Sequence, residues 1–182
     1  MAALHLPRRR ALNPDENMHV RAARPTDLDV LLDIWLRSVR ATHTFLSEED
    51  IQFYLPLVRE ALEAGHFEVS VLCSDTGAPM GFMGLNGSKV EAMFLAPEHR
   101  GRGGGRRLLD HARALCGELT LDVNEQNEAA RRFYEACGFV VEGRSERDGT
   151  GRPFPLLHMR RRAVGAASPA RGRRKGGGGG RS

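Results

Sequence analysis

A glycine-rich segment that carries several arginines, RGRGGGRR at residues 100–107, holds the residue types best suited to ligand binding. Glycines let a backbone approach a ligand without interference from a Cβ atom. A helix is predicted from Gly103 onward, and amides at a helix start lack intrahelical acceptors and lie at the positive end of the helix dipole. Arg100, Arg102 and Arg106 add charged donors whose geometry matches phosphate oxygens. The segment therefore predicts a polyphosphate site.

The spacing of the glycines separates several kinds of phosphate loop. A P-loop needs a lysine and then a serine or threonine after its last glycine, but two arginines follow Gly105, which excludes it. A dinucleotide-binding loop fits at Gly101 and Gly103, and Asp122 lies about twenty residues on, as its ribose-binding acid should. However, Arg106 replaces the third glycine and Asp122 lies inside an apolar stretch. This interpretation and a ligand-free surface loop stay open.

The remaining pattern, Arg100-x-x-Gly103-x-Gly105, resembles the signature loop of the Gcn5-related N-acetyltransferases (GNAT superfamily), which cradles the pyrophosphate of acetyl-CoA. A second stretch, NEAARRFYEACGF at residues 127–139, is similar to a late helix and the following strand of the same family. The resemblance covers residues 18–162. Within the family, the stretches SVRATHTFLS, VNEQN and PFPLLHM are similar to bacterial YjaB-type acetyltransferases.

The resemblance implies an acetyl-CoA-dependent N-acetyltransferase that acts on a primary amine, either a protein lysine or a small amine, by direct attack in a ternary complex. It also implies an α/β (α+β) fold with a GNAT-like mixed sheet of about seven strands, splayed between the fourth and fifth, and about four helices. Strand residues are expected to pair with the pantetheine arm. The implied cofactor-binding residues are Met93, Phe94, Leu95, Arg100, Arg102, Gly103, Gly104, Gly105, Arg106, Asn127 and Tyr134.

Tyr134 is the predicted general acid. Family enzymes often use a tyrosine here, and the pKa of a phenol is close enough to that of a thiol to protonate the leaving thiolate. The sequence pattern alone equally suits a core tyrosine beside Phe133. Asn127 has two interpretations as well, because it could cap its helix by side chain or bind the pantetheine amide.

Two residues are candidates for the base. Glu91 lies two residues before Met93 on a predicted strand, so it is expected on the same face of the sheet and near the splay. It also suits a solvated edge charge. His43 falls where the family usually forms its acceptor pocket, and its ordinary pKa suits proton transfer at neutral pH, but it also suits a helix-end cap. Asn124 is a further candidate for binding the acceptor, and no metal site is visible.

Alternating and helical periodicities fit this fold. Strands are predicted at 19–22, 67–73, 80–85, 89–95, 119–123, 139–144 and 156–159. Helices are predicted after a cap at Thr26, from Ser47 to about Leu62 with an interruption near Pro56, at 103–116 and at 127–137.

Both ends of the chain differ in composition from the domain between them. Residues 1–17 are expected to form a disordered leader, residues 18–162 the acetyltransferase domain, and residues 163–182 a disordered Gly/Arg-rich basic tail. Translation starting at Met18 is a further hypothesis. The tail holds five basic residues and no acidic ones, and the leader three arginines against two acids, so a formal net charge of +4 leaves about −2 on the domain. A nucleic-acid role is therefore not expected beyond weak nonspecific contact by the tail.

The chain is expected in the cytoplasm, because no apolar run approaches a membrane span and no signal peptide is visible. Its expected partners are acetyl-CoA and the amine substrate, and a homodimer stays open. Two other functions also stay open. One is a noncatalytic CoA-binding or sensing module, which the presence of Tyr134 argues against. The other is a nicotinamide-dependent oxidoreductase.

Overall fold

The computed structural model describes residues 18–163, so the predicted leader and nearly all of the predicted tail lie outside it. The described residues form a mixed sheet of seven strands with four helices, and two short 3-10 turns lie at Pro25–Asp27 and Pro97–His99. The elements are β1 (His19–Ala22), α1 (Leu28–Thr42), α2 (Glu48–Glu63), β2 (Glu68–Cys73), β3 (Pro79–Asn86), β4 (Lys89–Leu95), α3 (Gly104–Cys116), β5 (Leu119–Asn124), α4 (Glu128–Ala136), β6 (Val140–Ser145) and β7 (Leu156–Arg161). This confirms the predicted fold class.

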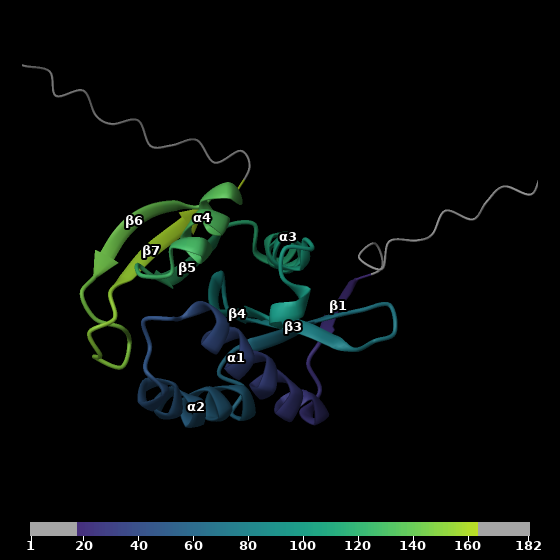
Figure 1. Cartoon of the computed structure of the whole chain (residues 1–182). Helices are drawn as coiled ribbons and strands as arrows, with labels where there is room; N and C mark the ends of the chain where they lie inside the picture. Colours follow the sequence, from purple (N-terminus) through teal and green to yellow (C-terminus); the bar gives the residue numbers. More distant parts are fainter. Residues whose placement is uncertain (1–17, 164–182) are drawn as a thin grey trace, which may run out of the picture.

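The strand order is β1-β2-β3-β4-β5-β7-β6. Every neighbouring pair is antiparallel except β4 and β5, which run parallel and are joined by only two residue pairs, Lys89 with Thr120 and Val90 with Leu121. Beyond Val90 the edge of β4 that faces β5 is unpaired, so the sheet splays there. Figure 1 shows β5, β6 and β7 diverging from the half that contains β1 to β4.

The helices cover the two faces of the sheet separately. On one face, α1 and α2 pack over the first half of the sheet, where the Trp35 and Phe94 rings meet edge to face with centroids 6.4 Å apart. On the other face, α3 and α4 bury Leu108, Leu109 and Tyr134 against the strands. Among the residues described, no helix is long and apolar enough to cross a membrane.

Two local predictions about the helices are wrong. The first helix begins at Leu28 rather than after a cap at Thr26, because the Asp27 carboxylate accepts the Arg24 backbone N–H at 2.7 Å and pairs with Arg21. The second helix continues through Pro56. A proline inside a helix removes one hydrogen bond, and the remaining turns hold because Ser47 and Asp50 form a complete capping box and the apolar side packs on α1.

Candidate active site

The loop before α3 presents a row of backbone amides. Gly101 and Gly103 have φ values of +74° and +85°, a left-handed conformation that favours glycine. The first backbone bond of the helix runs from the Arg107 N–H to the Gly103 carbonyl at 3.0 Å. The amides of Gly104, Gly105 and Arg106 therefore have no acceptor within the helix and lie at its positive end.

Two glycines bring this helix start close to the sheet and to α4. A Cβ atom on Gly104 would lie 2.7 Å from Cδ2 of Leu72, and one on Gly105 would lie 3.0 Å from Cζ of Phe133. A larger residue at either position would therefore require the side chain of Leu72 or Phe133 to shift. The glycines thus place the amide row beside the open edge of β4.

A cavity of about 340 Å³ lies between this helix start, the end of β4 and α4. Ten of the eleven predicted cofactor-binding residues line it, and Arg102 is the exception. A larger hollow of about 830 Å³ beside β1 contains none of the glycines of the loop. The sequence predictions missed Ser38 and Thr42 of α1, which also line the smaller cavity. The sequence feature that could have revealed them is a pair of small polar residues, four apart, on the sheet-facing side of an amphipathic helix.

Tyr134 lies on α4 and lines the cavity, with 9% of its surface exposed. Its ring packs edge to face on Phe133 and Phe139 at centroid distances of 5.3 and 5.6 Å. Burial, together with nearby Cys137, raises the pKa of the Tyr134 phenol above its ordinary value. The phenol therefore keeps its proton across the neutral range and can donate it.

Asn127 and Asn124 flank the start of α4. The Asn127 side-chain oxygen accepts the Ala130 backbone N–H at 3.1 Å, so the residue caps the helix, and it also lines the cavity. Asn124 ends β5, and its carbonyl accepts the Asn127 backbone N–H at 2.9 Å. The observed role of Asn124 is to form this turn.

His43 follows α1 and packs against Phe94 and Phe45, with ring centroids 6.3 and 5.5 Å away. The Thr42 hydroxyl donates a hydrogen bond to the Ser38 carbonyl at 2.8 Å, so its oxygen accepts a hydrogen bond from Nδ1–H of His43 at 2.7 Å. Burial, aided by the charge of Arg100, lowers the pKa of His43 to about 4. The imidazole is thus neutral near pH 7 and a weak proton acceptor.

Glu91 does not share the face of Met93. Gly84 pairs with Ala92 whereas Leu85 pairs with Val90, so Glu91 is the extra residue of a β-bulge. Met93 packs into the core under α3, whereas Glu91 lines a second cavity of about 420 Å³ on the α2 side of the sheet. The prediction of a shared face is wrong because the bulge breaks the alternation of the strand. Glu91 is paired with Lys89 at 3.3 Å.

The sequence model of the acetyltransferase (GNAT) family matches residues 29–139 of the chain. The chain belongs to this family. Peptidyl-lysine N-acetyltransferase YjaB of Escherichia coli (strain K12) is 45% identical over 140 residues, which cover 77% of this chain and 94% of YjaB. The solution structure of apo-form YjaB from Escherichia coli has a TM-score of 0.74 and 44% identity, and covers 82% of this chain and 99% of that one. The structure of yncA from Salmonella typhimurium with its cofactor acetyl-CoA has a TM-score of 0.57 and 25% identity, and covers 84% and 98% of the two chains.

Membership of the GNAT family makes the chain an acyltransferase, and the family uses acetyl-CoA. The loop suits that ligand, because its amides and arginines match a pyrophosphate and the open edge of β4 offers a strand partner. The structure also removes the dinucleotide interpretation. Asp122 faces away from the loop and pairs with Lys89 and His158, so it does not reach a ribose held there.

Proposed function

We propose that this GNAT acetyltransferase transfers the acetyl group of acetyl-CoA to the ε-amine of a lysine in a protein or peptide. The observation that carries this proposal is a single cavity that joins the amide row of α3, the open edge of β4 and the Tyr134 phenol. The lysine acceptor rests on similarity to YjaB, whose name gives peptidyl-lysine as its substrate. Small amines are the alternative acceptors.

The cavity suggests one orientation for acetyl-CoA. The amides of Gly104, Gly105 and Arg106 would bind the pyrophosphate, with Arg100 and Arg106 adding charge. The pantetheine arm would lie along the unpaired edge of β4 like an added strand. This places the thioester beside Tyr134, where the sheet splays.

The chemistry needs a neutral amine, a positioned carbonyl carbon and an acid. The lysine nitrogen forms a bond to the thioester carbonyl carbon, the carbon–sulfur bond breaks, and Tyr134 donates its phenolic proton to the sulfur. The proton that the nitrogen loses as the amide forms returns through solvent to the Tyr134 phenolate, so the phenol is restored and the protons balance. None of the three cysteines lines the cavity, which favours direct attack over an acetyl-enzyme.

The acceptor would enter from the α1 and α2 side. There the Glu91 carboxylate can attract a lysine ammonium, since it faces that side at the splay. His43 forms part of the wall in its neutral state and is no longer a strong candidate for the base.

Two measurements test the proposal. Thermal unfolding of the full chain should shift upward with acetyl-CoA and with CoA but not with NAD, since a ligand of the folded state stabilises it. Mass spectrometry should then find acetylation of a lysine peptide with a blocked N-terminus but not of the same peptide with arginine in place of lysine; a polyamine tests the small-amine alternative. Stabilisation by CoA without transfer to any amine would overturn the proposal in favour of a noncatalytic CoA module.

A further inference from the structure

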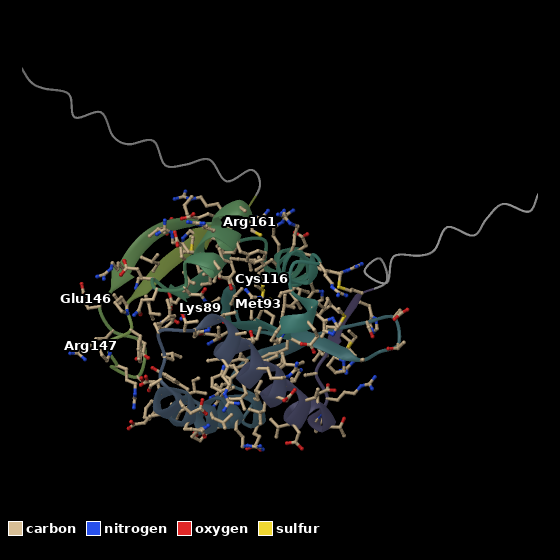
Figure 2. All side chains as sticks on the ribbon, viewed as in Figure 1. Lys89, Met93, Cys116, Glu146, Arg147 and Arg161 are labelled. Carbon is tan, nitrogen blue, oxygen red and sulfur yellow. The ribbon has the colours of Figure 1, made fainter. Side chains whose placement is uncertain are left out.

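A row of polar side chains crosses the sheet where it splays, on the face toward α1 and α2. Four strands that are adjacent in the sheet, β4, β5, β7 and β6, each contribute one member. Nζ of Lys89 lies 3.0 Å from Oδ2 of Asp122, Oδ1 of Asp122 lies 2.6 Å from Nδ1 of His158, and Nε2 of His158 lies 2.7 Å from Oγ of Ser145. Figure 2 shows Lys89 and Met93 between the two halves of the molecule.

The pairing of the strands fixes the position of this row. Asp122 directly follows Leu121, the last β5 residue that pairs with β4. Leu121 and Met159 are buried in the core under α3, so Asp122 and His158, which alternate with them, face the other side. That is the side from which the acceptor would enter.

The fold makes room for the imidazole of His158. Gly143 lies opposite His158 on β6, next to a bulge in that strand. A Cβ atom on Gly143 would lie 3.3 Å from Cδ2 of His158, closer than side chains normally pack. The histidine therefore sits in a space that the neighbouring strand leaves open.

The hydrogen bonds fix the proton positions. Burial raises the pKa of Asp122, but the hydrogen bonds from His158 and Lys89 outweigh this, so its pKa lies below the ordinary value. Asp122 is thus a carboxylate and accepts a hydrogen bond from Nδ1–H of His158. Nε2 then carries the lone pair and accepts a hydrogen bond from the Ser145 hydroxyl. This is the tautomer expected of a general base whose other ring nitrogen donates to a carboxylate.

We propose that His158 accepts the proton of the lysine ammonium, an inference that rests on the proposed function. The ammonium nitrogen gives one proton to Nε2 in place of the Ser145 hydroxyl, and Asp122 stabilises the imidazolium. The neutral amine then attacks the thioester, and the imidazolium returns its proton to water, since the His158 side chain is 41% exposed.

The surrounding charges suit a cation at this point. Asp122 and Glu91 offer two carboxylates, and Lys89 lies between them. Arg160, two residues farther along β7, is paired with Glu118 and Glu142 at 2.5 and 2.7 Å, and Glu142 also lies 3.8 Å from Arg162. The four carboxylates outnumber the three cations of this group, so its net charge is negative while the imidazole is neutral.

The decisive variant is His158→Gln, compared with His111→Gln on α3 as the matched control. For a lysine peptide near pH 7 we expect kcat/KM to fall about 100-fold, the usual contribution of general base catalysis. The loss should shrink as pH approaches the pKa of lysine, because the amine then deprotonates without help. An aminooxy side chain is uncharged near pH 7 and needs no base. His158→Gln should therefore acetylate a peptide with such a side chain at a rate within about threefold of that of the wild type.

The outcomes separate this proposal from the proposed function. If the wild-type protein acetylates no amine, the proposed function fails. If the wild type is active and His158→Gln keeps its lysine rate and pH profile, or loses the lysine and aminooxy reactions equally, only the role of His158 fails. Acetylation of Ser145 by acetyl-CoA without an acceptor would also overturn it, in favour of a serine nucleophile.

A second measurement tests the proposal on the wild-type protein, so it applies even if His158→Gln does not fold. Long-range nitrogen–proton NMR spectra of the wild-type protein report which ring nitrogen of each histidine carries the proton. The proposal requires a proton on Nδ1 of His158, with a change in this signal on substitution of Ser145 by alanine. A proton on Nε2 in the neutral state would contradict it.

Discussion

The hydroxyl of Tyr54 on α2 donates a hydrogen bond to the carboxylate of Asp148 in the loop between β6 and β7. Beside it, Arg152 of the loop forms an ion pair with Asp50 and places its guanidinium 3.9 Å from the centroid of the Phe53 ring. These contacts join α2 to the opposite half of the splayed sheet, as the loop in Figure 1 reaches toward α2. We call this joint, formed by Tyr54, Asp148, Asp50, Arg152 and Phe53, the clasp.

The clasp is expected to shape the entrance for the acceptor. Tyr54→Phe removes one hydroxyl and leaves Asp148 without that donor, so the free energy of unfolding should fall by about 1–2 kcal/mol. KM for a lysine peptide should rise, whereas the Kd of acetyl-CoA should stay the same, because none of the five clasp residues lines the proposed cofactor cavity. Burial, followed by the Asp148 hydrogen bond, raises the pKa of Tyr54 to about 12, so the joint should persist across the neutral range.

Chemical denaturation of Tyr54→Phe, Asp148→Ala and the double variant measures the coupling between the two residues. If the two single effects simply add, Tyr54 and Asp148 do not act together and the clasp does not hold the loop.

Tyr134→Phe tests the general acid. Phenylalanine keeps the packing against Phe133 and Phe139 and removes only the hydroxyl, so acetyl-CoA affinity by calorimetry should be preserved. Turnover of a lysine peptide should fall about 100-fold or more. Removing an acid needed only in the transition state lowers kcat without changing ground-state binding. Unchanged turnover would take Tyr134 out of the mechanism.

Much of this architecture follows from local sequence signals. Strand alternation, the Ser47 cap and the glycines before α3 are decided by a few neighbouring residues, so most of the elements and the phosphate-binding start of α3 could be predicted from them. The β4 and α4 residues of the cavity were predicted from the resemblance to the GNAT family instead. The predicted interruption of α2 at Pro56 was wrong because the packing of α2 on α1 outweighs the free-energy cost of the backbone hydrogen bond that proline removes.

Other features depend on pairing between distant strands. The face of Glu91 could not be inferred, because the bulge that turns it is set by the register with β3. Asp122 and His158 are 36 residues apart and meet only through the pairing of β5 with β7. His43 could be placed near the acceptor side, but its low pKa arises from burial between aromatic rings that the sequence does not reveal.

Asn127→Asp separates the observed capping role of Asn127 from its proposed role in binding acetyl-CoA. Aspartate is an equally good N-cap and its charge favours the start of α4, so the free energy of unfolding should change by less than about 0.5 kcal/mol. The substitution removes the amide donor and adds a negative charge, so the Kd of acetyl-CoA should rise about tenfold. Asn127→Ala, the control, should instead lose about 1 kcal/mol of stability. Equal acetyl-CoA affinity in Asn127→Asp and the wild type would leave Asn127 as a cap alone.

Gly103→Ala tests the loop before α3, and Gly77→Ala is its matched control. The two glycines have nearly the same φ, +85° and +84°, and an added Cβ would meet no atom within 4 Å at either site. Both substitutions should cost about 1–2 kcal/mol of stability through backbone strain. Only Gly103→Ala should weaken acetyl-CoA binding in calorimetry, because Gly103 lines the proposed cofactor cavity and Gly77 does not. Equal acetyl-CoA affinities of Gly103→Ala and Gly77→Ala would mean that the loop before α3 does not bind the cofactor.

His43→Phe is expected to change how stability depends on pH. The folded pKa of His43 is about 4, against an ordinary value of 6.5, so between these values the unfolded chain binds a proton that the folded protein does not. Wild-type stability should therefore fall as pH drops from about 6.5 to 4, by at most about 3 kcal/mol from this residue. Phenylalanine keeps a ring against Phe45 and Phe94 but does not titrate, so the variant should gain relative to the wild type over that range. Urea denaturation at pH 7, 5.5 and 4.5 measures this difference, and parallel stability profiles would mean that His43 is not held neutral by the fold.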